Sequence, residues 1–329
     1  MSADGAALGR RLRERDLSAA PQALNLLESS APHDRAQAAP LLAELSPLAL
    51  GGEAAGHVIA VTGPPGVGKS TLLSALLQSW RARGRTVAIL AVDPSSRRSG
   101  GSLLGDRARI EFDAADGGVL IRSTAAGDRL GGIAPSTAAA AHALAAAFDI
   151  VVIETVGVGQ SETDVADVAD TVAVVVQPGG GDVLQFLKSG IMEIPDVLVV
   201  TKADLGQLAI STGRDLSAAL RSLGAPATQV VAVSALPPPS GIEELADALE
   251  AHHVRGGVSE RRLRGRRASA LREFSAEHGA RGLRALGGRG AAQALLARQQ
   301  QGLGVPALVA ALDEALALSE GSVAGPAAP

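Results

Sequence analysis

Eight residues from Gly63 to Ser70 have the types and the spacing that bind phosphate groups. They read Gly-Pro-Pro-Gly-Val-Gly-Lys-Ser, which matches the pattern G-x-x-x-x-G-K-[ST], between an apolar run and a predicted helix. Glycines in such a loop let successive backbone N–H groups turn towards one anion, Lys69 is expected to neutralise β- and γ-phosphate oxygens, and the Ser70 hydroxyl is expected to bind Mg²⁺. The predicted nucleotide-binding residues of this loop are Gly63, Pro64, Gly66, Val67, Gly68, Lys69, Ser70 and Thr71.

Two later apolar runs end in residues that could read a base. The run 196–201 leads into Lys202-Ala203-Asp204, and the run 229–233 leads into Ser234-Ala235-Leu236. A carboxylate can accept hydrogen bonds from both N1–H and the exocyclic amine of guanine, whereas adenine presents an acceptor at N1. Asp204 therefore predicts GTP over ATP, by about 10⁴-fold if the wrong base leaves the carboxylate desolvated and unpaired. Lys202 is expected to lie along the base plane, and the Ser234–Leu236 loop to meet the guanine oxygen.

Further carboxylates follow two strand-like runs and are candidates for the metal site. Asp93 follows the run 86–92, Glu154 follows the run 150–153, and Asp106 lies in a glycine-rich loop. Hard cations take oxygen ligands, although Asp93 and Asp106 could instead only cap turns or helices. Gly157 has no side chain, so its N–H can approach a γ-phosphate and lose that contact on hydrolysis. The expected metal ligands are Ser70, Asp93, Asp106 and Glu154, and the expected catalytic residues are Lys69, Asp106, Glu154 and Gly157.

The elements that must position these residues alternate between strand and helix. Strands are expected near 57–62, 86–92, 119–122, 149–153, 171–177, 196–201 and 229–233. Unbroken apolar runs are typical of strands covered on both faces, which predicts an α/β fold with a doubly wound, mostly parallel sheet and a ligand at the carboxyl ends of its strands. This P-loop domain is expected over residues 57–253. Helical extensions are expected over 1–56, as one or two short helices, and over 254–329, as a candidate dimerisation arm.

Composition excludes several classes of protein. The chain has 329 residues, of which 47% are hydrophobic and 19% charged, which is enough for one large domain with extensions. A net charge of −4 and 2% aromatic residues give no footprint for nucleic acid. The chain contains no cysteine and no apolar stretch long enough to span a bilayer, so a cytoplasmic protein without a membrane partner is expected.

Three longer segments resemble a known family. They are Asp149–Glu162, Gly100–Asp106 and Lys188–Asp204, which are similar to the corresponding motifs of the MeaB/ArgK family of SIMIBI-class P-loop GTPases. The resemblance covers roughly residues 57–250. It implies a homodimer that binds GTP, GDP and Mg²⁺, hydrolyses GTP, and acts as a chaperone that gates cofactor loading on an adenosylcobalamin-dependent acyl-CoA mutase.

The resemblance also assigns switch segments. Residues 155–165 are similar to switch II, and 177–188 to a partner-sensing switch with Gln185 and Lys188 at its key positions. Many Ras-like GTPases carry Gln directly after the switch glycine, whereas this chain has Val158, so slow intrinsic hydrolysis that a partner stimulates is expected. Many relatives have Asn where this chain has Thr201. The shorter hydroxyl side chain is expected to weaken guanine affinity without changing the selectivity for guanine.

Alternative functions differ in their predicted chemistry. A kinase acting on a periplasmic lysine, arginine and ornithine transport system would use ATP and a phosphate acceptor. A nickel-insertion GTPase would need His or Cys ligands, and only His252 and His253 are adjacent. The arginine-rich segment 255–272 fits either a solvated helix face or a surface for an acidic partner.

Overall fold

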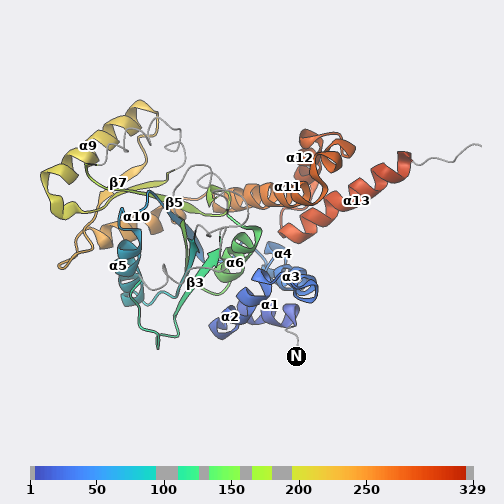
Figure 1. The fold of residues 1–329 in the computed structure, drawn as a ribbon, viewed down its shortest axis with the longest axis horizontal. Helices are drawn as coiled ribbons and strands as arrows, with labels where there is room; N and C mark the ends of the chain where they lie inside the picture. Colours follow the sequence, from blue (N-terminus) through green and yellow to red (C-terminus); the bar gives the residue numbers. More distant parts are fainter. Residues whose placement is uncertain (1–3, 94–109, 126–132, 156–164, 180–194, 324–329) are drawn as a thin grey trace, which may run out of the picture. The chain divides into compact units, whose positions relative to one another are not determined.

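The computed structural model describes residues 4–93, 110–125, 133–155, 165–179 and 195–323 (Figure 1). The chain divides into two compact units. One is Ala55–Val258, and the other combines Met1–Ala54 with Ser259–Pro329.

The first unit contains a seven-stranded sheet in the order β3-β2-β4-β1-β5-β6-β7. Every pairing between neighbouring strands is parallel, which confirms the predicted doubly wound α/β fold. The strands are β1 (His57–Thr62), β2 (Val87–Asp93), β3 (Val119–Ala125), β4 (Ile150–Thr155), β5 (Thr171–Val176), β6 (Val197–Val200) and β7 (Gln229–Ala232). All residues of β1, β4 and β5 are buried, because helices cover both faces of the sheet at its centre.

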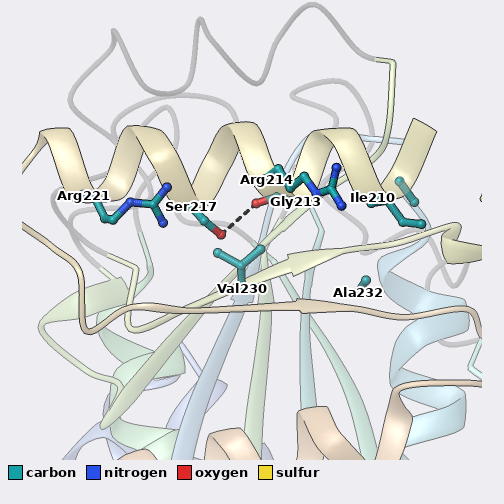
Figure 2. Close-up of a pocket in the computed structure, with 8 residues that line it drawn as sticks. Ile210, Gly213, Arg214, Ser217, Arg221, Val230 and Ala232 are labelled. Carbon is teal, nitrogen blue, oxygen red and sulfur yellow. Dashed lines mark hydrogen bonds between the residues drawn. The ribbon is translucent and has the colours of Figure 1, made fainter. Parts of the chain in front are cut away.

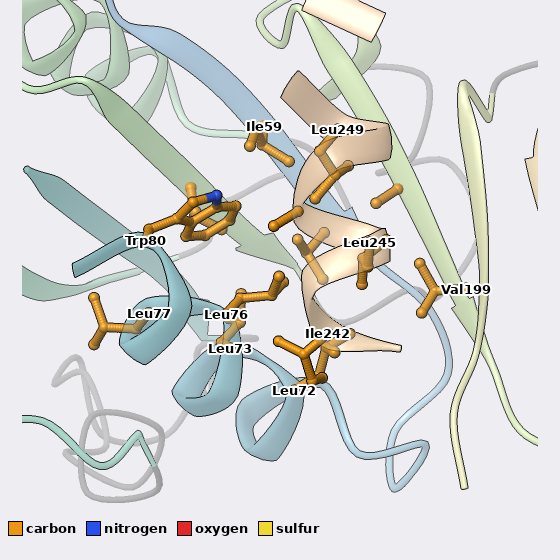
Figure 3. Close-up of a cluster of buried hydrophobic side chains, with 14 of the residues drawn as sticks. Ile59, Leu72, Leu73, Leu76, Leu77, Trp80, Val199, Ile242, Leu245 and Leu249 are labelled. Atoms are coloured by element: carbon orange, nitrogen blue, oxygen red, sulfur yellow. The ribbon is translucent and has the colours of Figure 1, made fainter. Parts of the chain in front are cut away.

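Helices α5 (Lys69–Ala82) and α10 (Ile242–Val254) lie side by side on one face of the sheet (Figure 3). Trp80 of α5 is fully buried there and packs in one cluster with Leu76, Leu245 and Leu249. Helix α6 (Pro135–Ala145) packs against β1, β2 and β4, and α9 (Gln207–Ser222) packs against β6 and β7. These helices and the core beneath them pack against the strands whose carboxyl ends carry the candidate site residues.

Polar contacts connect the amino-terminal ends of the central strands, at the edge of the sheet opposite the carboxyl ends. Thr171 Oγ1 lies 2.8 Å from His57 Nε2 and 2.8 Å from His252 Nδ1. His252 Nε2 lies 3.2 Å from Asp196 Oδ1, and the rings of His57 and His253 stack with centroids 4.2 Å apart. When neutral His252 donates to Asp196, its Nδ1 must accept the Thr171 hydroxyl, so the threonine oxygen is left to accept from His57. His252 and His253 therefore contact residues at the amino-terminal ends of the strands, and neither is part of the phosphate loop.

The second unit joins the two ends of the chain. Helices α1 (Gly5–Arg13), α2 (Ala20–Glu28), α3 (Pro32–Glu44) and α4 (Pro47–Leu50), with the 3₁₀ turn Leu17–Ala19, precede the sheet. Helices α11 (Val258–Ala285), α12 (Arg289–Arg298) and α13 (Val305–Val323) follow it and share a core around Phe274, Leu296 and Leu312. The expectation of one or two helices before the sheet is wrong, because a proline in the first turn starts each of α2, α3 and α4 anew.

Two arginines of the arginine-rich segment bind within this unit. The guanidinium of Arg266, 3% exposed, forms two hydrogen bonds of 2.8 and 2.9 Å with the Glu53 carboxylate, and Arg262 donates to the carbonyl oxygen of Ala54 at 2.6 Å. For Arg262 and Arg266, both interpretations of the arginine-rich segment, as a solvated helix face or as a surface for an acidic partner, are wrong.

Within the described ranges, no helix is both long enough and apolar enough to cross a membrane.

The carboxylate of Asp116 is held by Arg81, and this pair yields a prediction about pH. Arg81 Nε and Nη2 donate to its two oxygens at 2.7 and 2.8 Å, and the Gly118 N–H donates at 2.9 Å. These contacts lower the pKa of Asp116 below 3.8, with the Arg81 hydrogen bonds as the largest cause. We expect Asp116→Asn to lower the free energy of unfolding by about 1 kcal/mol at neutral pH. Because the folded carboxylate binds its proton less readily than the unfolded one, its contribution is complete above pH 3.8 and is lost as the pH falls through the lowered pKa.

Urea unfolding of the two proteins between pH 7 and pH 3 measures this difference. The gap in unfolding free energy between wild type and Asp116→Asn should narrow in the acidic part of the range. If the difference in unfolding free energy stays constant down to pH 3, the ionised Arg81–Asp116 pair does not contribute to stability.

Candidate functional site

The loop after β1 has a backbone that glycine allows and other residues strain. Gly63, Gly66 and Gly68 have φ values of 147°, 79° and 97°. A Cβ on Gly63 would collide with the carbonyl oxygen of Val175 in β5, whereas positions 66 and 68 face open space. Helix α5 begins directly after the loop, so its N-terminal N–H groups also point towards it. The loop is therefore an open cradle of backbone donors at the point where β1 lies between β4 and β5.

Lys69 is folded over this cradle. Its Nζ donates to the carbonyl oxygens of Gly63 at 2.7 Å and Pro64 at 3.0 Å, and the residue is 6% exposed. These two contacts and its burial hold the ammonium group at the mouth of the loop.

Two oxygen donors meet beside the loop. The Ser70 hydroxyl lies 3.3 Å from Glu154 Oε1, and Glu154 is 6% exposed near the end of β4. Val61 of β1 pairs with Glu154, which brings the two strand ends into register. A hydroxyl and a buried carboxylate are hard oxygen ligands, so this pair fits Mg²⁺ held together with phosphate oxygens.

The residues expected to read the base converge from β6 and β7. The Ser234 hydroxyl donates to Asp204 Oδ1 at 2.8 Å, which orients the carboxylate. Thr201, the first residue after β6, donates from Oγ1 to the carbonyl oxygen of Val67 at 2.7 Å. The base-reading segment and the phosphate loop are therefore connected by a buried hydrogen bond.

Lys202 adopts an unusual backbone conformation and contacts a neighbouring strand end. Its φ of 55° lies in the left-handed region, which is uncommon for a residue with a side chain. Its Nζ donates to Oε1 of Gln177, the first residue after β5. Residue types alone do not predict this contact, because its two partners lie 25 positions apart in the sequence.

The described part of the chain brings most of the candidates together. Around the loop and strand ends lie Gly63, Pro64, Gly66, Val67, Gly68, Lys69, Ser70, Thr71, Glu154, Lys202, Asp204, Ser234, Ala235 and Leu236. The backbone of Asp93 ends β2. Asp106, Gly157, Val158, Gln185 and Lys188 lie outside the described residues. Among the residues described, no three or more His, Cys, Asp or Glu side chains form a group that could hold a metal ion by themselves.

Known proteins share both sequence and fold with this chain. A GTPase-named protein of Pyrococcus horikoshii is 44% identical over 195 residues, 59% of each chain, so the match spans about three fifths of that relative. A "Probable GTPase" of Mycobacterium tuberculosis is 42% identical over 254 residues, 74% of each chain. The mouse "Methylmalonic aciduria type A homolog, mitochondrial" is 43% identical over 157 residues, 47% of this chain and 38% of the relative.

A solved structure named "LAO/AO transport system kinase" superposes with a TM-score of 0.63 at 27% identity, covering 95% of this chain and 98% of the other. Residues 20–283 match the family described as "Methylmalonyl Co-A mutase-associated GTPase MeaB". The phosphate loop, the base-reading strand ends and this match agree, and the chain belongs to the MeaB family of P-loop GTPases.

Proposed function

We propose that this GTPase is a chaperone of an adenosylcobalamin-dependent acyl-CoA mutase of the methylmalonyl-CoA mutase type, and that GTP binding and hydrolysis gate cofactor loading and protect the mutase. The observation that carries the proposal is the match of residues 20–283 to a family described as mutase-associated. The mouse relative, named for methylmalonic aciduria, supports the same class of client.

Roles for the site residues follow from the contacts. Lys69 would neutralise the β- and γ-phosphates, and Asp204, oriented by Ser234, would accept hydrogen bonds from guanine. Ser70 and Glu154 would hold Mg²⁺, with Asp93 and Asp106 as further expected ligands; the bound ion would supply positive charge to the phosphate oxygens.

A route between nucleotide and partner is suggested by one contact. Lys202, expected on the base plane, donates to Gln177, where the segment expected to sense the partner begins. A base that displaces or fixes Lys202 would therefore change the contact at the start of that segment, which is how a local ligand contact can bias a switch.

We further propose that the protein is a cytoplasmic homodimer. Its partner would be the mutase, and it would bind neither nucleic acid nor a membrane. Light scattering on the purified chain would measure the dimer directly, and a monomer at micromolar concentration would contradict this part.

Single-turnover GTP hydrolysis with and without methylmalonyl-CoA mutase tests the gating function. We expect slow hydrolysis by the isolated chain and an acceleration of about tenfold or more with the mutase, because a partner would have to order the attacking water that Val158 cannot orient. An unrelated acyl-CoA enzyme at the same concentration is the control. Fast turnover by the isolated chain that the mutase leaves unchanged would contradict the proposal.

The name of the similar solved structure keeps a second function in view, a kinase of an amino-acid transport system. That function would use ATP and move the γ-phosphoryl group to a protein acceptor. Asp204 favours guanine, so we expect the label of γ-³²P GTP to appear as free phosphate. Label on a transport binding protein with ATP as donor would favour the kinase instead.

A further inference from the structure

A groove of about 320 Å³ lies between α9 and the edge strand β7, and none of its lining residues belongs to the phosphate loop (Figure 2). Strand β7 is last in the sheet, and Val230 and Ala232 point from it towards the helix. Opposite them, α9 presents the small residues Gly213 and Ser217, so the helix backbone approaches the strand without filling the space. The helix thus overhangs the open edge of the sheet.

Two arginines stand on the groove side of α9. Arg214 and Arg221 both line the groove and are exposed. Neither forms a salt bridge with any residue in the portion of the chain that the structure covers, unlike Arg81 and Arg83 of the first unit. Seven residues, or two turns, separate them, which places their Cα atoms about 10 Å apart along the helix. Two guanidinium groups at this spacing, without a salt-bridge partner among the described residues, can each form a bidentate pair with a carboxylate.

Apolar side chains also border the groove. Ile210, which is 47% exposed, and Val230 both line it beside the arginines. Exposed apolar side chains gathered beside charged groups are typical of protein interaction sites. A simple inorganic anion would use the arginines but leave these side chains in water.

We propose that this groove, defined by Ile210, Arg214, Ser217, Arg221 and Val230, binds an acidic segment of a partner protein. Two carboxylates of that segment would meet Arg214 and Arg221, and apolar side chains between and beside them would cover Val230 and Ile210. The partner is a protein and not a nucleic acid, because the chain is acidic overall, with a net charge of −4, and carries few aromatic residues for stacking. The groove includes none of the base-reading residues, so it can be changed without altering them.

Fluorescence anisotropy with a labelled twelve-residue peptide, in which two leucines lie between two glutamates, tests the proposal on the full chain. The double variant Arg214→Glu with Arg221→Glu reverses the charge of the groove. Arg255→Glu reverses the charge of one exposed arginine outside the groove. It is the control for the single variant Arg214→Glu, which changes the net charge by the same amount. Circular dichroism melts verify that each variant is folded.

We expect saturable binding by wild type that weakens about tenfold or more in the double variant and in 0.5 M salt, and that Arg255→Glu leaves unchanged. A peptide with glutamines in place of the glutamates should bind about tenfold more weakly or not at all. The absence of binding by wild type, equal binding of the two peptides, or equal binding by the double variant would overturn the proposal. Tighter binding of single-stranded RNA than of the peptide would also overturn it.

Discussion

Replacing Lys69 with alanine is expected to lower the single-turnover rate of GTP hydrolysis by about 10³-fold. The ammonium group is buried and held by the carbonyl oxygens of Gly63 and Pro64, at the loop expected to bind the phosphates. A charge already in place stabilises the negative charge that develops on the phosphate without a cost of reorganisation. Rapid-quench measurement with labelled GTP, at enzyme in excess, gives the rate.

Gln78→Ala is the matched control for Lys69→Ala. Gln78 lies on the same helix but is exposed, nine residues or about two and a half turns further along. This variant should hydrolyse GTP at the wild-type rate. If Lys69→Ala also keeps the wild-type rate while binding GTP, the loop does not act on the phosphates as described.

Replacing Asp204 with asparagine is expected to weaken GTP binding by about 10³-fold or more and to improve the binding of xanthosine triphosphate. The amide can still accept the hydrogen bond from Ser234, which in wild type holds Oδ1 at 2.8 Å. Its NH₂ group, however, would face the exocyclic amine of guanine, donor against donor. Xanthine has a carbonyl at that position and would accept the amide hydrogen.

Ser234→Ala distinguishes the base contact from its support. Loss of this hydroxyl leaves the carboxylate but removes its orientation, so GTP affinity should fall only about tenfold, with no gain for xanthosine triphosphate. Competition binding with a fluorescent GDP analogue measures all three proteins. If Asp204→Asn binds GTP as tightly as wild type, Asp204 does not read the base.

The sheet could be predicted from sequence because its central strands are buried on both faces. Runs such as Ile150–Thr155 and Thr171–Val176 are almost continuously apolar, and no competing periodicity obscures them. The helices before the sheet were harder to count, since α3 has little amphipathic pattern and a proline sets the start of each of α2, α3 and α4. Nothing in the sequence indicated that residues 1–54 would pack with residues 259–329, because that depends on side chains more than 200 positions apart.

The parts of the candidate site that lie within one short segment could be predicted from sequence. The contacts between residues at the ends of different strands could not. The loop at Gly63–Ser70 and the carboxylates at Glu154 and Asp204 stand at the ends of apolar runs, which parallel topology brings together. The bonds from Thr201 to Val67 and from Lys202 to Gln177 depend on strand order, which residue types do not encode.

Titration calorimetry with non-hydrolysable analogues of GTP and ATP, each with and without Mg²⁺, measures the base preference of the site. We expect the GTP analogue to bind about 10⁴-fold more tightly than the ATP analogue, and its binding to weaken markedly when Mg²⁺ is removed. Equal or tighter binding of the adenosine nucleotide would contradict the assignment of Asp204 and, with it, the nucleotide gate.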